Sequence, residues 1–441
     1  MIQTLGQLNT VTKSTMSHQG CSHFSFVHRA HYLREPKSLT LHVLLLVEHK
    51  RIQAIITLRD ITAAVQENSA SAAECFDRTA SETASQPIDL TEPLPLSTVE
   101  IPKPWGKEIW YTGIEERGVS KIKKTPIAWV LDIFGAALGF PNPPMLLKIL
   151  APFPEKNLGD LYFEMHEKKT EVYVVTAIDR SAWPSGTGKI RYGFNAEKLE
   201  TYENEGEFFN AYLVAVSLYR EVRNKIDQHL DASGAQSGLT LPLSRGQQEK
   251  LLRELPESLR TEEQSRRDSM YAFTSLRNLA VGDIVKVPPF LPHSLQHGVR
   301  VIEFQTPHYE RYILSFGQKV LTQNHWDTET VADRIQMAPA DITPPEEIEP
   351  GMDLAADFDA FRVLRLRLSP GDEKTICHSA YSICIGIEGN TTLRIEGRQT
   401  PNTLLTGIGP ESAFMIRPNE SQEYQNPGKE PVCVLIALAK M

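Results

Sequence analysis

Short β-rich runs separated by turn residues are the feature that most limits how this chain can fold. In the first half of the chain such runs cover residues 108–111, 146–150, 161–165 and 171–178. Similar runs return at residues 283–287 and 299–304. Runs of this length, bounded by Gly, Pro, Asn or Ser, are typical of strands. The sequence therefore predicts a mainly β protein.

One segment departs from this pattern. Phe208, Tyr212, Val216 and Tyr219 recur at helical spacing, with charged residues between them. Leucines repeat the spacing near residue 251. A helical insertion is predicted at about residues 196–280, and because strands precede and follow it, we expect both sets of strands to share one sheet system.

The C-terminal part predicts a second β unit. Residues 341–360 are rich in Pro, Asp and Glu and are interpreted as an acidic linker. Five short runs follow, at residues 361–368, 382–387, 391–395, 412–416 and 432–438. The dipeptide Gly389-Asn390 is a two-residue hairpin signal. Residues 361–441 are therefore predicted to form a second small β-barrel or sandwich.

The N-terminal part gives the weakest pattern. Residues 39–65 contain enough apolar alternation for one or two strands or a short helix. Residues 68–95 are rich in Ser, Ala, Thr, Glu and Pro, and such low hydrophobicity does not offset the entropy cost of ordering. We interpret residues 1–94 as a poorly defined extension and linker, and residues 95–340 as the first β domain with its insertion.

Composition excludes several classes of function. The chain has 46 basic and 55 acidic residues, a net charge of -9, and so lacks the basic footprint of a nucleic-acid-binding protein. No apolar stretch reaches the ~20 residues that span a bilayer, so no membrane partner is expected. Five cysteines without a CxxC pair indicate neither a disulfide framework nor a thiolate metal site. These features predict a cytoplasmic protein.

Two segments carry the residues of a candidate metal site. Glu164 and His166 are two apart, which places both side chains on one face of a strand, and Glu171 can return on the next strand. His293 follows a Pro-rich turn about 120 residues later. Imidazole nitrogen and carboxylate oxygen are ligands that a divalent metal accepts. A lone His on a strand is usually an ordinary residue, so it is the pair of segments that predicts a metal site.

The two segments resemble cupin motifs one and two, and their surroundings are similar to the type I phosphomannose (mannose-6-phosphate) isomerases. The resemblance covers residues 102–324 well, the C-terminal unit in outline, and the first 90 residues not at all. The matching features are the strand Met145-Leu-Leu-Lys148-Ile-Leu, the run Lys169-Thr-Glu171-Val-Tyr, Arg191-Tyr-Gly-Phe, the segment from Pro288 to Gly298, and Val301-Ile-Glu303-Phe-Gln with Arg311 after it.

This resemblance implies a fold, an activity and a set of site residues. The fold would be two cupin-like β-barrels (jelly rolls), with the helical insertion in the first and no metal ligands in the second. The activity would be zinc-dependent conversion of mannose 6-phosphate to fructose 6-phosphate through an enediol, with one zinc ion per chain. The implied zinc ligands are Glu164, His166, Glu171 and His293, and the implied substrate or catalytic residues are Lys148, Lys169, Glu303 and Arg311.

Position 164 departs from the family pattern, which usually has Gln there. A second carboxylate makes the site formally neutral with a divalent ion, and this would weaken the ion as a Lewis acid.

Such an isomerisation needs a polarised carbonyl, a base beside the carbon acid and a holder for the phosphate. Glu303 is the candidate base, and Arg311 or the two lysines would hold the phosphate. Two other functions fit the same metal ligands: a metal-dependent cupin dioxygenase and a non-catalytic sugar-binding cupin protein. The cations Lys148, Lys169 and Arg311 favour a phosphorylated sugar, because an apolar oxygenase substrate would not require them.

Overall fold

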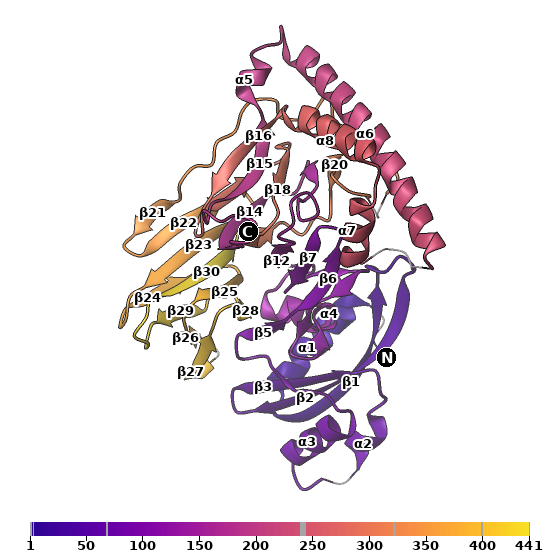
Figure 1. The fold of residues 1–441 in the computed structure, drawn as a ribbon. Helices are drawn as coiled ribbons and strands as arrows, with labels where there is room; N and C mark the ends of the chain where they lie inside the picture. Colours follow the sequence, from indigo (N-terminus) through magenta and orange to yellow (C-terminus); the bar gives the residue numbers. More distant parts are fainter. Residues whose placement is uncertain are drawn as a thin grey trace.

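The computed structural model describes residues 2, 4–67, 69–238, 244–320, 323–397 and 400–440. The protein is mainly β, with antiparallel sheets at its centre, helices α6 (Glu205–Gln236) and α8 (Glu257–Tyr271) along one edge, and a separate N-terminal sheet (Figure 1). Among these residues every sheet pairs its strands in a linear order, so none closes on itself. The predicted mainly β class is confirmed, whereas the jelly-roll barrels stay a prediction.

Two sheets enclose the centre of the first β unit. The six-stranded sheet has the order β17 (Ile284–Val287), β14 (Glu171–Ile178), β19 (Val299–Gln305), β12 (Leu146–Pro152), β7 (Gly106–Trp110) and β6 (Val99–Lys103). The five-stranded sheet has the order β16 (Thr274–Leu279), β15 (Gly188–Phe194), β18 (His293–Leu295), β13 (Phe163–Met165) and β20 (Tyr312–Ser315). Side chains of both sheets meet in one buried apolar cluster, which includes Leu150, Ile190 and Leu295.

The six-stranded sheet is buried on both faces, and the period of two along its strands sorts the side chains. On β14, Val172 and Val174 pack into a core shared with the N-terminal and C-terminal sheets, whereas Tyr173 and Val175 face the five-stranded sheet. By the same alternation, the polar residues of three central strands face the five-stranded sheet: Lys148, Glu171, Glu303 and Gln305. Buried charges in apolar strands are therefore collected on one inner face.

The helical segment lies between β15 and β16, within the range for which the periodicity predicts helices. It contains α5 (Ala196–Leu199), α6, α7 (Arg245–Arg253) and α8. Asn204 caps α6 by accepting a hydrogen bond from the backbone of Glu207. Phe208, Tyr212 and Tyr219 of α6 are buried against Phe163 and Phe194 of the five-stranded sheet. The insertion therefore covers the outer face of that sheet.

The N-terminal residues differ from the extension and linker that the sequence suggests. They form a four-stranded sheet of β1 (Gly20–Ala30), β2 (Lys37–Glu48), β3 (Arg51–Thr57) and β4 (Ile88–Asp89), with helices α1 (Leu5–Ser17), α2 (Thr62–Gln66) and α3 (Ala72–Glu82). Helix α3 lies inside the expected linker, and its Phe76 is buried against Leu44 and Ile55. Composition alone did not reveal this, because two apolar side chains anchor an otherwise polar helix.

The C-terminal unit pairs with earlier parts of the chain. Its nine-stranded sheet has the order β11 (Thr125–Pro126), β10 (Lys121–Ile122), β5 (Leu94–Ser97), β28 (Ala413–Ile416), β25 (Ser382–Glu388), β30 (Val432–Ala439), β23 (Phe361–Leu368), β22 (Met352–Asp357) and β21 (Glu346–Glu349). Strands β21 and β22 fall within the expected acidic linker. Helix α4 (Ile127–Leu138) continues from β11 into the core shared by these sheets.

The second C-terminal sheet contains β24 (Glu373–Cys377), β29 (Ser421–Gln425), β26 (Thr391–Gly397) and β27 (Thr400–Ile408), and β8 (Ile114–Glu115) pairs with β9 (Gly118–Val119) elsewhere. Gly389 and Asn390 do form the turn between β25 and β26, with Gly389 at φ 69°. The two strands then join different sheets, so the predicted hairpin pairing is wrong.

In the part of the chain that the structure describes, no helix is both long enough and apolar enough to cross a membrane. None of the five cysteines forms a disulfide.

Candidate active site

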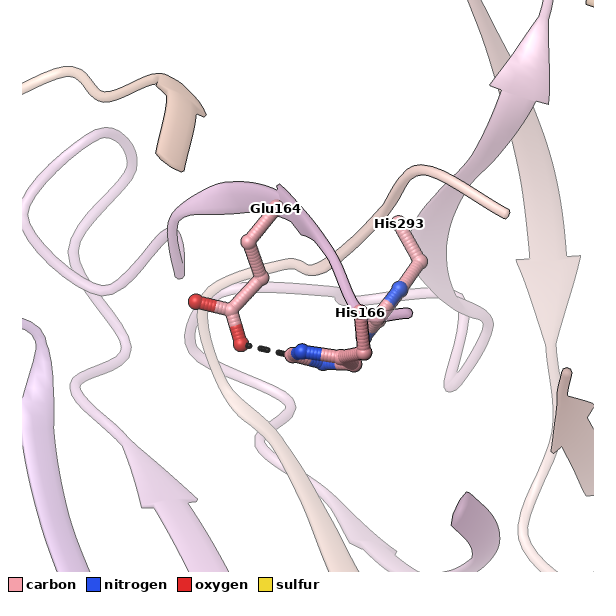
Figure 2. Close-up of side chains that lie close together, drawn as sticks. All are labelled: Glu164, His166 and His293. Atoms are coloured by element: carbon pink, nitrogen blue, oxygen red, sulfur yellow. Dashed lines mark ion pairs between the residues drawn. The ribbon is translucent and has the colours of Figure 1, made fainter. Parts of the chain in front are cut away.

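Glu164, His166 and His293 lie close together at strands β13 and β18 of the five-stranded sheet. Glu164 on β13 and His293 on β18 are cross-strand partners, and His166 follows β13 directly. One donor atom from each of the three lies within 4.8 Å of the other two. Figure 2 shows the Glu164 carboxylate directed at the His166 ring, with the His293 side chain next to that ring. Both histidines are buried.

Glu171 completes the cluster from the facing sheet. Its carboxylate oxygens lie 3.6 Å from Nε2 of His166 and 3.2 Å from Nε2 of His293. Nε2 of His166 is also 3.6 Å from Oε1 of Glu164. Tetrahedral bonds of about 2.0 to 2.2 Å to a zinc ion separate the donor atoms by about 3.3 to 3.6 Å. The distances from His166 to Glu164 and Glu171, and from His293 to Glu171, therefore fit a divalent metal.

The pattern of hydrogen bonds in the cluster also supports a metal site. Nε2 of His293, both ring nitrogens of His166 and Oε2 of Glu164 are buried without a hydrogen-bond partner. Nδ1 of His293 lies 3.0 Å from the carbonyl oxygen of Leu291, and donation to this carbonyl leaves Nε2 as the lone-pair nitrogen. Burial, with a contribution from Lys169, lowers the pKa of His166 to about 4. A neutral imidazole with an unpaired nitrogen is a ready metal ligand.

Two neighbours hold the Glu171 carboxylate. Tyr173 donates a hydrogen bond of 2.7 Å to Oε2, and the Lys169 ammonium forms an ion pair with Oε1. Burial raises the pKa of Glu171, but the charge of Lys169 and the two histidines outweigh it and hold the pKa well below the usual range. Glu171 is therefore an anion in a fixed orientation.

A cavity of about 230 Å³ lies beside the cluster. Glu164 and Lys169 form part of its wall. The wall also carries four further cations, Lys103, Arg117, Lys148 and Arg311, and two further carboxylates, Glu108 and Glu310. With five cations against three carboxylates, the cavity has an excess of positive charge next to the metal cluster.

Buried ion pairs connect the cavity wall to Glu303. The Lys148 ammonium lies 3.2 Å from the Glu303 carboxylate and 4.0 Å from that of Glu108. Lys103 pairs with Glu108 at 3.1 Å, and Trp110 donates a hydrogen bond of 2.7 Å to the same carboxylate. Burial lowers the pKa of Lys148, but Glu108 and Glu303 raise it by more, so Lys148 is charged. Lysines and carboxylates thus alternate along this wall.

Glu303 is nearly inaccessible, at 1 % exposure. Burial and the neighbouring Glu171 carboxylate raise its pKa well above the usual range, against the opposing charge of Lys148. It does not line the cavity, since Lys148 occupies that part of the wall.

Arg311 is part of the cavity wall. Its Nε is 3.8 Å from Oε2 of Glu164, and its guanidinium carbon lies 4.5 Å from the centre of the Tyr162 ring. The planar group thus contacts both a candidate metal ligand and an aromatic ring.

The structure therefore brings all eight predicted site residues into one neighbourhood, seven of them in the cluster or the cavity wall and Glu303 behind the wall. Sequence reasoning missed Lys103, Glu108, Arg117 and Tyr173. A carboxylate among the apolar residues of β7 was a usable signal for Glu108. Tyr173 lies two residues after Glu171 on β14, so its contact with that carboxylate is local. Lys103 reaches the site through the pairing of β6 with β7, and Arg117 through the turn between β8 and β9.

The sequence matches no protein-family model and no curated protein. Solved structures with a related arrangement include the mannose 6-phosphate isomerase of Bacillus subtilis, at 13% identity and a TM-score of 0.47, covering 79% of this chain and 99% of that chain. Another is the apo mannose 6-phosphate isomerase of Salmonella typhimurium, at 12% identity and a TM-score of 0.48, covering 79% and 99%. Similarity at this level assigns neither a family nor an activity to this chain.

Proposed function

We propose that this protein is a metal-dependent isomerase of sugar phosphates that interconverts mannose 6-phosphate and fructose 6-phosphate in the cytoplasm. One observation carries the proposal: a cluster of two imidazoles and two carboxylates adjoins a cavity with five cations in its wall. The cluster suits a divalent ion, and the cations suit a phosphate ester.

Glu164, His166, Glu171 and His293 would hold the metal, and zinc fits their nitrogen and oxygen donors. When bound, such an ion acts as a Lewis acid that stabilises negative charge on the sugar oxygens. Lys169 and Tyr173 keep Glu171 anionic and oriented, so that the ligand set is fixed before substrate arrives.

Glu303 is the proposed base that moves the proton between C1 and C2 of the sugar. Its raised pKa suits this task, because a general base works best when its pKa lies near the working pH. Since Lys148 separates Glu303 from the cavity, the proposal requires the Lys148 side chain to turn aside when substrate binds. Lys148 then remains beside the developing negative charge.

Arg311 is the proposed phosphate ligand. A guanidinium binds a phosphate through two parallel hydrogen bonds, whereas an ammonium acts as a point charge. Because Arg311 lines the same cavity as Glu164, it would hold the phosphate while the carbonyl end of the sugar lies toward the metal cluster.

The direct test is an activity screen of the purified, metal-analysed protein with hexose and pentose phosphates. Isomerisation of mannose 6-phosphate, lost on chelation and restored by zinc, is the expected result. A metal-loaded protein that isomerises no phosphorylated sugar would contradict the proposal and favour a sugar-binding protein, and oxygen uptake with an apolar substrate would favour a dioxygenase.

A further inference from the structure

A second, larger cavity lies on the opposite face of the strands that carry the metal cluster. Its volume is about 730 Å³, within the range of about 300 to 1,000 Å³ that is usual for small-molecule sites. Strand β18 separates the two sites: His293 and Leu295 face inward, whereas Gln296, just after the strand, lines the second cavity. The C-terminal end of α8 covers it through Arg267 and Tyr271.

An oriented histidine stands in the wall of this cavity. Nδ1 of His297 lies 2.6 Å from Oδ1 of Asp160, and the same oxygen accepts the backbone N–H of His297 at 3.0 Å. Both side chains are buried, at 7% and 4% exposure. Donation from Nδ1 to the carboxylate leaves Nε2 as a hydrogen-bond acceptor in the neutral ring. Trp183 fixes the ring plane by stacking on it, with the ring centres 4.6 Å apart.

The wall of the same cavity carries four cations, Lys156, Lys189, Arg191 and Arg267, and three carboxylates, Glu155, Asp160 and Asp268. Lys189 and Arg191 are two apart on β15 and so project from the same face of the sheet. The Arg191 guanidinium carbon lies 3.6 Å from the centre of the Tyr271 ring, and Nη1 donates to Thr274 Oγ1 at 2.7 Å. Among the ion pairs of the described residues, none involves Lys189 or Arg191. Nε of Arg191 is buried without any hydrogen-bond partner.

Lys189 and Arg191 form no ion pair among the described residues, and two such cations in the wall of one cavity favour an oxyanion as ligand. Nε2 of His297 adds an acceptor that calls for a hydroxyl on the same ligand. The geometry points to a second binding site here, separate from the metal cluster, for a small oxyanion that also carries a hydroxyl group. This inference does not depend on the proposed isomerase activity.

Hydrogen phosphate is the simplest probe, because it combines an oxyanion with one P–OH group. The experiment titrates phosphate into the full-length Arg311→Ala protein by calorimetry, at constant ionic strength, so that the proposed phosphate ligand of the first cavity is absent. One saturable site is expected, and Arg191→Gln should weaken it at least about tenfold, since hydrogen bonds to charged groups are worth roughly 1.5 to 3 kcal/mol.

Arg277→Gln is the matched control, because Arg277 lies on the neighbouring strand β16, pairs with Asp341 and does not line the cavity. It should leave phosphate affinity unchanged. Lys189→Gln should weaken binding in the same direction as Arg191→Gln, and it keeps the test decisive if Arg191 proves necessary for folding.

Sulfate tests the role of His297, because it has the charge of the oxyanion but no hydroxyl. Sulfate is expected to bind at least about tenfold more weakly than phosphate, because it cannot donate a hydrogen bond and leaves Nε2 of His297 without a partner. No saturable phosphate binding in the millimolar range would overturn the site. Equal affinity in Arg191→Gln and the parent would do the same, and equal sulfate affinity would overturn the hydroxyl-accepting role of His297.

Discussion

Lys148 and Glu303 are cross-strand partners on β12 and β19, and their charged groups lie 3.2 Å apart, with Lys148 in the cavity wall and Glu303 behind it. This relationship places the proposed base behind a cation that the substrate must displace. Glu303→Gln keeps the shape of the side chain but removes its basicity. A positioned base contributes about 10² to 10⁴-fold, so we expect kcat to fall by at least about 100-fold, with metal content unchanged by elemental analysis. Wild-type turnover in Glu303→Gln would transfer the role of base to another group.

The metal site predicts the result of removing either imidazole. His166→Ala and His293→Ala should each lose the metal, because both imidazoles belong to the group of three donors that lie within 4.8 Å of one another. Metal content after dialysis is the measurement, with about one divalent ion per chain expected for the wild type. His229→Ala, an exposed histidine on α6, serves as the control and should retain the ion. Full retention in either site variant would count decisively against the site.

The second carboxylate at the metal site, Glu164, leads us to expect a higher turnover when it is replaced. Glu164→Gln should keep the metal while leaving net positive charge at the site, which strengthens it as a Lewis acid. It also frees Arg311 from a carboxylate 3.8 Å away. We expect kcat to rise several-fold on zinc loading, measured with mannose 6-phosphate. If both turnover and metal affinity stay at wild-type values, Glu164 is not a ligand.

Arg311 predicts a loss of substrate binding without a loss of metal. Arg311→Ala should lower kcat/KM at least about tenfold, from the roughly 1.5 to 3 kcal/mol of a hydrogen bond to a charged group. Arg311→Lys should recover only part of this, because the ammonium lacks the planar fork. Arg300→Ala, which removes a guanidinium paired with Glu411 on the surface, is the control. Unchanged efficiency in Arg311→Ala would refute the assignment.

Lys103 predicts a pH dependence of substrate affinity. Burial lowers its pKa to about 8, although Glu108 opposes the shift. Because the folded pKa is lowered, Lys103 is charged below about pH 8 and neutral above it, and the cavity loses one positive charge as the pH rises. KM for the sugar phosphate should therefore rise between pH 7 and pH 9 more steeply in the wild type than in Lys103→Met. Identical profiles for the two proteins would exclude Lys103 from substrate binding.

The four metal ligands could be predicted because their signal is local. Glu164 and His166 share a strand face through a spacing of two, and His293 follows a turn that the prolines mark. Lys103 carries no such signal, and for Glu108 the only signal is a carboxylate among the apolar residues of β7. They reach the cavity because β6 pairs with β7 and β7 pairs with β12, which sets Trp110 opposite Lys148. This register depends on three separate segments and cannot be predicted from the sequence of any one of them.

Three C-terminal strands, β24, β27 and β29, have no apolar run to identify them. In β29 only Gln422 and Tyr424 are buried, so one aromatic side chain carries most of the strand's burial. Helix α3 escaped prediction for a related reason, since its burial rests chiefly on Cys75 and Phe76. Where the packing of one or two side chains determines the structure of a segment, its average composition does not predict that structure.

Strand β5 has a consequence for the order in which the chain folds. It lies near the start of the first β unit, yet it pairs with β28 through Leu94 and Met415, more than 300 residues later. During synthesis the N-terminal parts emerge first, at roughly 5 to 20 residues per second. One edge of β5 must then wait for strands made at the very end of translation, and an unpaired edge is a template for wrong partners. A chain whose synthesis stops after residue 340 therefore cannot complete the nine-stranded sheet that contains β5.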